Sequence, residues 1–414
     1  MILSQDFKRR LLQNNLLLFL MYKSNNILNI KFVNYIHMSV HKKEHHSEVK
    51  SITRHVALGN QKFKPLPKPT GASPYHMKLE DIISQDDMKK IIDSGKITFH
   101  VTGDTGGVKY PVPQQIVEMA MESDLAGPDK PVFFYHLGDV VYYFGQASEY
   151  YPQFYEPYAK YSAPIFAIPG NHDGDVPPSD ATPSLDAFVR NFCAKKRLVV
   201  PDSVEVDKPA MVQPNVYFTL ETPFATIVGL YSNVPEGGEF DDSQIAWFKG
   251  ELRNAPKNKA LIVTVHHPAY SADLYHTGSK VIDETLDNAF SESGRYADIV
   301  FAGHVHNYQR FTRRIDNRDI PYIVAGAGGY WHLHYMQKQP NGDPLPVPYT
   351  MPDSDTTLES YCENRHGYLL MQITQNSISG TYHTVPRPHE SWRTKSELFD
   401  SFTLDLFTHE MKKQ

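Results

Sequence analysis

The sequence predicts a layered α/β fold whose β-sheets are covered by helices on both faces. From residue 97 onward, short and mainly apolar segments alternate with segments whose apolar residues recur at helical spacing. Uniformly apolar strands are typical of sheets that are buried on both sides, and the helices between them provide the cover. The composition agrees, because 41% of the 414 residues are hydrophobic and 21% are charged, as in an ordinary globular chain.

The strands that we expect are apolar runs of four to six residues, bounded mostly by glycine, proline or polar residues. They are residues 97–101, 132–137, 164–168, 225–229, 260–265, 299–302, 322–325 and 368–373. Three segments have apolar residues in phase with a helix: one that begins near Pro113, one at 242–252 and one at 283–292. Segment 336–359 is rich in proline, glycine and aspartate, so we expect an irregular loop that forms one wall of a site.

We divide the chain into four regions. They are a leader or disordered tail at 1–46, an N-terminal extension with a proline-rich linker and one helix at 47–95, the main domain at 96–385, and a C-terminal tail at 386–414, for which a helix is one option. The apolar run at 16–22 follows three basic residues, as in a signal peptide, but no small-residue cleavage site comes after it. The run is too short to span a bilayer, so we expect no stable membrane span and favour a cytoplasmic over a secreted location.

Charge and cysteine content exclude some classes of function. The formal net charge is −6, so no overall basic surface marks a nucleic-acid partner, and we expect none. The two cysteines, Cys193 and Cys362, form either one disulfide or two free thiols. We favour free thiols, because two cysteines in a chain of this length are not a disulfide framework. Nothing in the sequence decides the oligomeric state.

Five clusters of polar residues lie at or just after the ends of predicted strands. They are 102–107, 138–142, 170–173, 266–268 and 303–306, and they contain Asp, Asn, His and Tyr side chains. In open α/β sheets, ligands bind outside the carboxyl ends of the strands, so these clusters are expected to meet at one place. Each cluster alone has a simpler explanation, such as a turn at Asp104 or a loop cap at Asn171. Together, in this order and each at a strand end, they predict a site.

The residue types in these clusters suit two metal ions. Carboxylate and phenolate oxygens are hard ligands, whereas imidazole and carboxamide suit a divalent ion. Two cations about 3.5–4 Å apart clamp the attacking and leaving oxygens of a phosphoryl transfer, and a carboxylate between them balances their charge. The pair His304-X-His306 is the best single indication, because two imidazoles around a short turn can chelate one centre.

The motifs resemble those of the calcineurin-like metallophosphoesterases. They read Gly-Asp-X-Gly (103–106), Gly-Asp-X-X-Tyr (138–142), Gly-Asn-His-Asp (170–173), Val-X-X-His (263–266) and Gly-His-X-His (303–306). Within that superfamily they resemble the purple acid phosphatases, whose mark is the tyrosine of the second motif. The resemblance extends over about 96–385 and implies a four-layer α/β/β/α sandwich of two mixed sheets flanked by helices, with the main domain as the catalytic domain.

The same resemblance implies two metal ions and a set of ligands for each. A ferric ion would be held by Asp104, Asp139, Tyr142 and His306. A second, divalent ion (Fe, Zn or Mn) would share Asp139 as the bridge and would be held by Asn171, His266 and His304.

Three further histidines are candidates for contact with the substrate. The resemblance implies that His172 assists the leaving group or orients the phosphate. His276 lies where the family commonly has another substrate-facing histidine, and its alternative is a solvated loop residue. His267 competes for the same role, and we rank it below His276. Trp331 and its neighbours, through His334, either line the pocket or pack locally.

We therefore predict a dinuclear-metal phosphohydrolase of the acid phosphatase type. It would hydrolyse phosphate monoesters of a phosphorylated small molecule by attack of a metal-bound hydroxide. One alternative is a phosphodiesterase that acts on cyclic nucleotides or phospholipid head groups, because the metal centre does not distinguish the two. A non-enzyme alternative is a binding protein with a degenerate site, which we disfavour because every expected ligand position is filled.

Overall fold

Two β-sheets form the centre of the molecule, and each contains both parallel and antiparallel strand pairs. The structure is a computed structural model that describes residues 62–412, apart from 353–354 and 391–394. All described residues belong to one compact unit, Val56–Gln414. The leader predicted for residues 1–46 and the start of the predicted extension lie outside the described residues.

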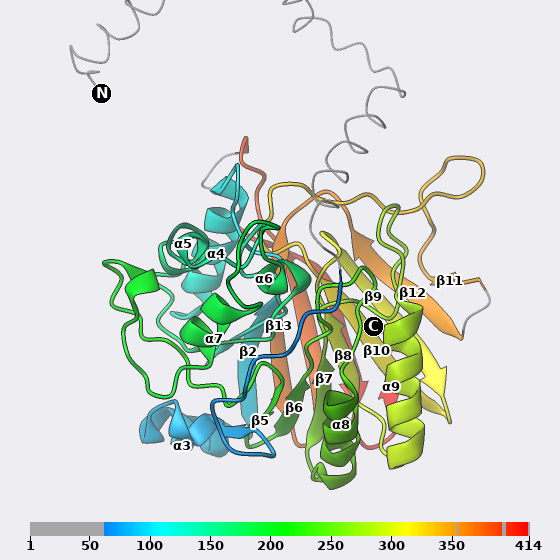
Figure 1. Ribbon diagram of the computed structural model, residues 1–414. Helices are drawn as coiled ribbons and strands as arrows, with labels where there is room; N and C mark the ends of the chain where they lie inside the picture. Colours follow the sequence, from blue (N-terminus) through cyan, green and yellow to red (C-terminus); the bar gives the residue numbers. More distant parts are fainter. Residues whose placement is uncertain (1–61, 353–354, 391–394, 413–414) are drawn as a thin grey trace, which may run out of the picture. The chain divides into compact units, whose positions relative to one another are not determined.

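The first sheet, within the described residues, has nine strands (Figure 1). They are β1 (His76–Lys78), β5 (Phe218–Glu221), β6 (Ala225–Gly229), β7 (Ala260–Thr264), β8 (Ile299–Ala302), β9 (Tyr308–Ile315), β10 (Arg318–Ala325), β11 (Tyr349–Thr350) and β12 (Thr356–Cys362). Their order across the sheet is β1-β5-β6-β7-β8-β10-β9-β12-β11. Strands β6, β7, β8 and β10 are mutually parallel, so their carboxyl ends share one edge of the sheet.

The second sheet has seven strands among the residues that the structure describes. They are β2 (Lys96–Thr102), β3 (Phe134–His136), β4 (Ile165–Ala167), β13 (Gly367–Thr374), β14 (Ser377–Thr384), β15 (Glu397–Asp405) and β16 (Glu410–Met411). Their order is β16-β15-β14-β13-β2-β3-β4, and β2, β3 and β4 are parallel neighbours. All eight predicted strands are present in the two sheets, so that prediction is confirmed.

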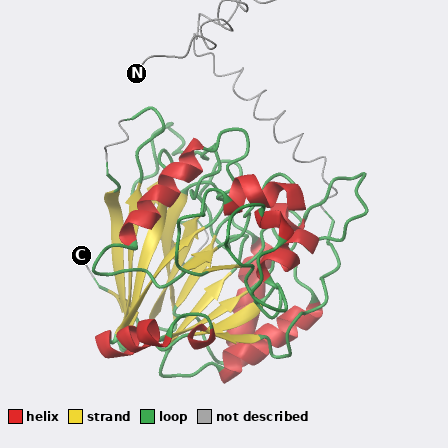
Figure 2. Cartoon of the chain, turned by 90° about the vertical axis from the view of Figure 1, so that its left-hand side faces the viewer, coloured by secondary structure: helices red, strands yellow, loops and turns green. Residues whose placement is uncertain are grey.

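Helices surround the two sheets, as Figure 2 shows. They are α3 (Gln85–Ser94), α4 (Val112–Asp124), α5 (Ala147–Tyr150), α6 (Asn171–Gly174), α7 (Asp186–Phe192), α8 (Asp242–Asn254) and α9 (Lys280–Ser293), with short helical turns at Leu79–Asp81, Tyr151–Tyr155 and Pro201–Ser203. Polar side chains cap the starts of the longer helices: Ser84 accepts from the backbone of α3, and Ser279 from that of α9. Both helices end at a glycine in the left-handed conformation.

Alternate residues of the central strands face two different cores. Ile227 of β6 and Ile262 of β7 lie between the sheets, in a cluster with Phe134 of β3. Their neighbours, including Val228 and Val263, face the other way and pack against α8 and α9. Because both faces are covered, every position of these strands is buried, which explains the uniformly apolar sequence. The predicted α/β/β/α sandwich is therefore the observed fold.

Three predictions about the flanks and loops need correction. The C-terminal tail is not helical, because Glu397–Asp405 pairs with β14 as strand β15. Phe402 and Leu404 are buried at a period of two, and the open edge of β14 satisfies the backbone of β15. The predicted extension also gives a strand, β1, to the nine-stranded sheet. The predicted loop at 336–359 contains β11 and the start of β12, so it is only partly irregular.

Membrane topology can be assessed only over the described part of the chain. None of the helices found there combines the length and the hydrophobicity that a bilayer crossing requires.

Candidate metal centre

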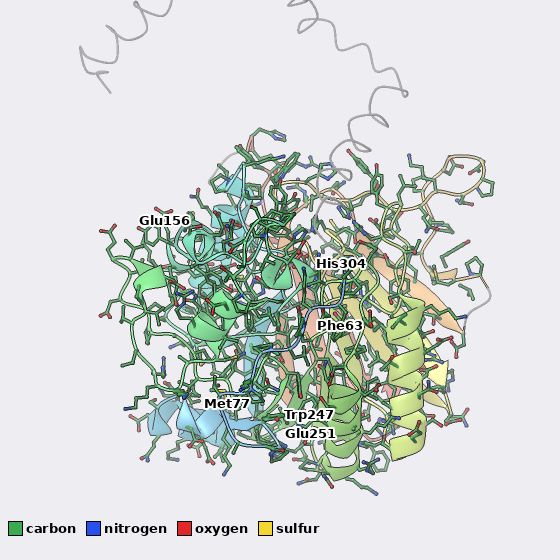
Figure 3. The ribbon with its side chains drawn as sticks, in the orientation of Figure 1. Phe63, Met77, Glu156, Trp247, Glu251 and His304 are labelled. Carbon is green, nitrogen blue, oxygen red and sulfur yellow. The ribbon has the colours of Figure 1, made fainter. Side chains whose placement is uncertain are left out.

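Seven predicted ligands meet where the parallel strands of the two sheets end. Asp104, Asp139 and Asn171 follow β2, β3 and β4, which are neighbours in the seven-stranded sheet. His266 and His304 follow β7 and β8, which are neighbours in the nine-stranded sheet, and Tyr142 and His306 lie in the same loops as Asp139 and His304. Figure 3 shows His304 near the upper end of the strands, far from Trp247 and Glu251 on α8.

The backbone at these strand ends adopts conformations that side chains rarely take. Asp104, Asp139 and His304 have φ angles of 55°, 53° and 67°, in the left-handed region. Such conformations cost free energy and persist where the surrounding structure fixes them, which is common at functional sites. Glycines leave room for the carboxylates, because a Cβ on Gly170 would collide with Asp139, and one on Gly303 would lie 2.6 Å from Asp104 Oδ2.

Asp104, Tyr142 and His306 form the first half of the site. The Tyr142 hydroxyl lies 3.2 Å from Asp104 Oδ1 and 3.2 Å from His306 Nε2, and these last two atoms are 3.6 Å apart. His306 Nδ1 lies 3.2 Å from the carbonyl oxygen of His332, to which it can donate. That bond leaves Nε2 with a lone pair that faces the other two residues.

Asp139, Asn171, His266 and His304 form the second half. Asn171 Oδ1 lies 3.1 Å from His266 Nε2 and 3.1 Å from His304 Nδ1. Asp139 Oδ2 lies 3.4 Å from His266 Nε2, and Asp139 Oδ1 accepts from the backbone N–H of His172 at 2.9 Å. Both carboxylate oxygens of Asp139 are therefore directed into the same buried space.

The donor set fits metal ions, because the lone pairs of several oxygen and nitrogen atoms converge there, and too few N–H and O–H groups are present to pair with all of them. His266 Nδ1 can donate to the carbonyl oxygen of Leu137 at 2.8 Å, and Nε2 then faces the acceptor oxygens of Asn171 and Asp139. Without a metal, a proton takes the place of the cation: burial opposes the charge on His266, but Asp139, Asp104 and the Leu137 carbonyl together raise the pKa of His266 to about 9. Such a site attracts positive charge.

Burial disfavours the ionised forms of the acidic groups of the site, so their ionisation depends on a nearby cation. Burial, with a contribution from Asp139, raises the pKa of the Asp104 carboxyl to about 7. Burial and the two carboxylates hold the pKa of the Tyr142 phenol well above 10. A phenolate at Tyr142 therefore requires a positive charge beside it.

The three candidate substrate histidines differ in position. The His172 ring lies 4.6 Å from the Tyr142 ring, and its Nδ1 can donate to the carbonyl oxygen of Tyr143 at 2.8 Å. His276 is partly exposed, and its ring lies 4.8 Å from that of His304. His267 is 1% exposed, and its Nδ1 lies 2.7 Å from Ser232 Oγ. The geometry therefore favours His276 over His267 for contact with a substrate.

Two residues that support the site, Asp173 and Gln153, received no role from the sequence. Asp173 accepts backbone N–H groups from Gly170, Val140 and Val141, so its carboxylate ties the loop after β3 to the loop after β4. Gln153 bonds both the N–H and the carbonyl of Tyr142, at 2.9 and 2.7 Å. Asp173 belongs to a recognisable motif, but nothing in the sequence around Gln153 marks its role.

His334 packs beside the site and was predicted either to line it or to pack locally. Its ring lies 4.4 Å from that of His306 and 5.0 Å from that of His276. It is 8% exposed, and burial lowers its pKa well below the usual value. His334 therefore packs against both His306, a proposed ligand, and His276, the histidine that we expect to face the substrate.

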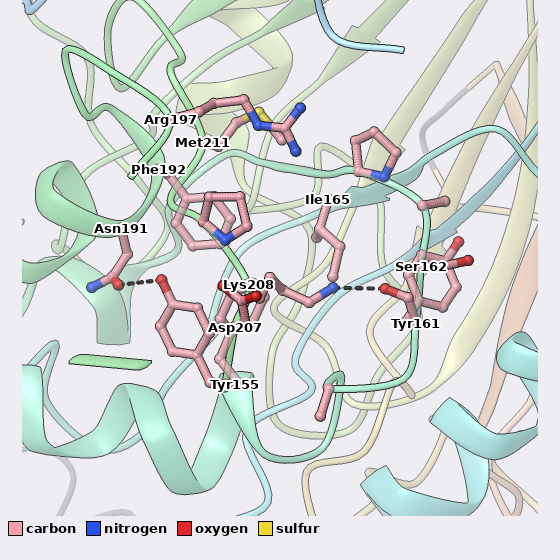
Figure 4. A pocket seen from close by; sticks show the side chains of 15 residues that line it. Tyr155, Tyr161, Ser162, Ile165, Asn191, Phe192, Arg197, Asp207, Lys208 and Met211 are labelled. Atoms are coloured by element: carbon pink, nitrogen blue, oxygen red, sulfur yellow. Dashed lines mark hydrogen bonds between the residues drawn. The ribbon is translucent and has the colours of Figure 1, made fainter. Parts of the chain in front are cut away.

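A separate cavity of about 180 Å³ lies away from the metal centre (Figure 4). Its lining includes Tyr155, Tyr161, Phe192 and Lys208 and none of the seven predicted ligands. The Lys208 ammonium donates to the carbonyl oxygen of Tyr161 at 2.7 Å. The cavity contributes no group to the site described above.

Comparison with known proteins defines the family. Residues 97–308, just over half of the chain, match the family model for calcineurin-like phosphoesterases, and the chain belongs to this family. Within it, the chain falls in the purple acid phosphatase-like branch. Purple acid phosphatase 21 of Arabidopsis thaliana is 26% identical over 247 residues, which cover 58% of this chain and 48% of that protein.

Two further matches show how far the similarity extends. A probable inactive purple acid phosphatase 9 of Arabidopsis thaliana is 27% identical over 287 residues, which cover 62% of this chain and 42% of that protein. The purple acid phosphatase PPD1 from yellow lupin (Lupinus luteus) seeds shares the fold, with a TM-score of 0.53 at 15% identity, covering 82% of this chain and 55% of that one. The chain thus spans about half the length of the relatives that it matches. Members of these families use two metal ions.

Proposed function

We propose that this chain is a dinuclear-metal phosphohydrolase that hydrolyses phosphate monoesters. The observation that carries the proposal is the meeting of Asp104, Asp139, Tyr142, Asn171 and three histidines at the carboxyl ends of β2, β3, β4, β7 and β8. A family relationship to phosphoesterases supports the reaction class. A scaffold with a degenerate site would not need to keep this complete donor set.

The two halves of the site would hold different ions. Asp104, Tyr142 and His306 offer hard oxygens and one imidazole, which suits Fe(III). Asn171, His266 and His304 offer one carboxamide and two imidazoles, which suits divalent Fe, Zn or Mn. Asp139 would bridge, because a carboxylate oxygen of Asp139 lies within 4.8 Å both of Asp104, in the first half, and of His266, in the second. When bound, the two ions would neutralise the charge of the phosphoryl oxygens and activate water for attack on phosphorus.

The chain's own side chains would orient the substrate and manage the proton. His172 is held by the carbonyl oxygen of Tyr143 through Nδ1, so its Nε2 remains free to bond a phosphoryl or leaving oxygen. His276 would present a second imidazole from the opposite sheet. A proton delivered to the leaving alcohol oxygen from either ring would avoid the release of an alkoxide.

The surroundings of His276 suggest the kind of alcohol that the site accepts. Leu274, Tyr275 and Tyr335 are 50%, 37% and 52% exposed, although each is a large apolar residue. The first and last of these lie together, because the N–H of Leu274 donates to the carbonyl oxygen of Tyr335 at 2.9 Å. An apolar rim beside a phosphate site favours esters whose alcohol part is aromatic or aliphatic.

Two substitutions test the proposed function directly. Asp139→Asn removes the charge of the proposed bridge, and His304→Ala removes one ligand of the divalent ion. Both should abolish hydrolysis of an aryl phosphate and lower the bound metal below two ions, with an unchanged circular dichroism spectrum. Asp180→Asn is the control, because Asp180 is exposed and its side chain bonds only Thr182 among the described residues. Near-normal turnover in the first two variants would exclude the proposed site.

A further inference from the structure

The carboxylate of Glu236 lies between two histidines of the candidate site. Its Oε1 is 3.0 Å from His276 Nδ1, within hydrogen-bonding distance, and 3.8 Å from His304 Nε2, within ion-pair distance. Glu236 lies in the segment between β6 and α8, far in sequence from both histidines. Neither the sequence motifs nor the family match assigns it a role.

The contact fixes which nitrogen of His276 faces the site. A carboxylate accepts only, so Nδ1 of His276 must carry the hydrogen that Glu236 receives. The other nitrogen, Nε2, is then left for a further partner. Two further rings contact that of His276: His334 stacks on it with centroids 5.0 Å apart, and His304 lies in a T-shaped arrangement with it at 4.8 Å.

A second carboxylate fixes the backbone of the same loop. Asp273 Oδ1 accepts the N–H groups of Tyr275 and His276, each at 2.7 Å. Asp273 also accepts from Asn307 Nδ2 at 3.1 Å, and Asn307 follows His306 directly. The His276 loop is therefore tied at its backbone to the segment of the proposed ligands and at its ring to Glu236.

Glu236 also faces His304 on the side away from the metal centre. His304 Nδ1 is directed to Asn171 Oδ1, so the Nε2 that approaches Glu236 is the nitrogen not used by the site. In metal sites, a carboxylate behind a histidine ligand commonly fixes its tautomer and orientation. The 3.8 Å between Glu236 and His304 Nε2 is too long for a hydrogen bond, so Glu236 fixes the tautomer of His276 alone in this way.

We propose that Glu236 is a positioning residue that holds His276 with its Nε2 directed at the phosphoryl group of the substrate. This inference rests on the proposed function above. It gives His276 a defined orientation in place of a solvated loop position, and it makes the segment between β6 and α8 part of the substrate site. It also predicts that Glu236 acts through His276, so the two residues should not contribute independently.

The test compares Glu236→Ala and Glu236→Gln in the full chain. Glu236→Ala removes the acceptor, and kcat/KM for an aryl phosphate should fall by about 10- to 100-fold, the usual range for partners of this kind. Glu236→Gln should lose less, because its amide oxygen can still accept from His276 Nδ1. Glu239→Ala is the matched control: Glu239 is exposed on the same segment, and its side chain makes no hydrogen bond or ion pair among the described residues.

A double-mutant cycle and a binding measurement distinguish positioning from general damage. In a His276→Ala background, Glu236→Ala should cause little further loss, because its partner is already absent. The affinity for inorganic phosphate, measured by calorimetry on zinc-loaded protein, should fall about tenfold in Glu236→Ala and stay unchanged in Glu239→Ala. Imidazole ¹⁵N spectra of the zinc-loaded wild type should show His276 protonated at Nδ1 and should change in Glu236→Ala.

Several results would overturn the inference. Additive losses in the cycle would show that Glu236 does not act through His276. A wild type that binds a third metal ion, lost in Glu236→Ala, would mean that Glu236, His276 and His304 hold a metal instead. A wild type without bound metal or hydrolytic activity would refute the proposed function, whereas an active wild type with an unaffected Glu236→Ala variant would refute only this inference.

Discussion

Tyr142→Phe is the substitution that most directly tests the identity of the metal centre. It removes one oxygen and leaves the ring, which is 1% exposed, in its place. That oxygen lies 3.2 Å from Asp104 Oδ1 and 3.2 Å from His306 Nε2, so it occupies the space where the proposed ferric ligands meet. If Fe(III) binds there, a phenolate gives the protein a visible charge-transfer band, and the variant should lose it.

These contacts set the expected losses of stability and of iron affinity in Tyr142→Phe. In the metal-free protein, the variant loses a hydrogen bond to a buried carboxylate, which corresponds to about 1.5–3 kcal/mol of unfolding free energy. In the loaded protein, it loses one of four proposed ligands. The iron affinity should then fall by at least about tenfold, since even partners outside the ligand shell have effects of that size. Urea unfolding with and without iron, together with metal titration, measures both effects.

Tyr143→Phe provides the matched control. Tyr143 is the adjacent residue, and within the described part of the chain its hydroxyl is hydrogen-bonded only to that of Tyr330, at 3.4 Å. This variant should keep the colour, the iron affinity and most of the stability. A Tyr142→Phe variant with the wild-type spectrum and iron affinity would refute the assignment of Tyr142 as a ligand. A colourless wild type with two divalent ions would refute the ferric site while leaving the dinuclear centre in place.

Two other predictions concern the stability of the fold. Burial raises the pKa of the Glu118 carboxyl to about 7, so the neutral carboxyl contributes to stability below pH 4.5 and this contribution is lost as the pH rises through 7. The Glu118→Gln variant should therefore be more stable than the wild type by about 1–2 kcal/mol at pH 8, allowing for solvent screening. At pH 4 the two proteins should be nearly equal in stability. A pH-independent difference in urea unfolding would contradict this. Asp400 on β15 accepts two bonds from Arg310 on β9, at 2.7 and 3.0 Å, and joins the two sheets. Asp400→Ala should cost about 3–5 kcal/mol because it leaves a half-buried charge unpaired, and a loss below 1 kcal/mol would show that water replaces the carboxylate.

The strands of the two sheets could be predicted because the fold buries them on both faces. Strands such as β6 and β7 are buried at every position and contain one threonine each as their only polar residue, so their sequences differ plainly from the helices and loops around them. The C-terminal strand β15 was missed because only its second half is buried. Its first three residues, from Glu397, are exposed, which conceals the period of two. The short strand β1 gives no signal of its own and depends on its pairing with β5.

The candidate site also contains some residues that the sequence identified and others that only the structure revealed. Residues in motifs directly after strands, such as Asp139 and His304, were found because their types and order are distinctive. Gln153 and Glu236 lie in segments of ordinary composition, and only their contacts reveal them. The preference for His276 over His267 also required the structure, since only the structure shows that His267 is buried and that His276 is partly exposed.

The sequence by itself determined the fold class, the order of the strands along the chain and the set of predicted ligands. The fold class and the strand order follow from apolar runs and helical spacing, whereas the set of predicted ligands follows from motifs at strand ends that resemble those of a known family. Only the tertiary structure decided which strands are neighbours, and therefore that loops from two different sheets face one another. It also gave Glu236 two histidine partners that lie 40 and 68 residues away. Contacts between distant segments depend on how the sheets pack, and no local pattern encodes them.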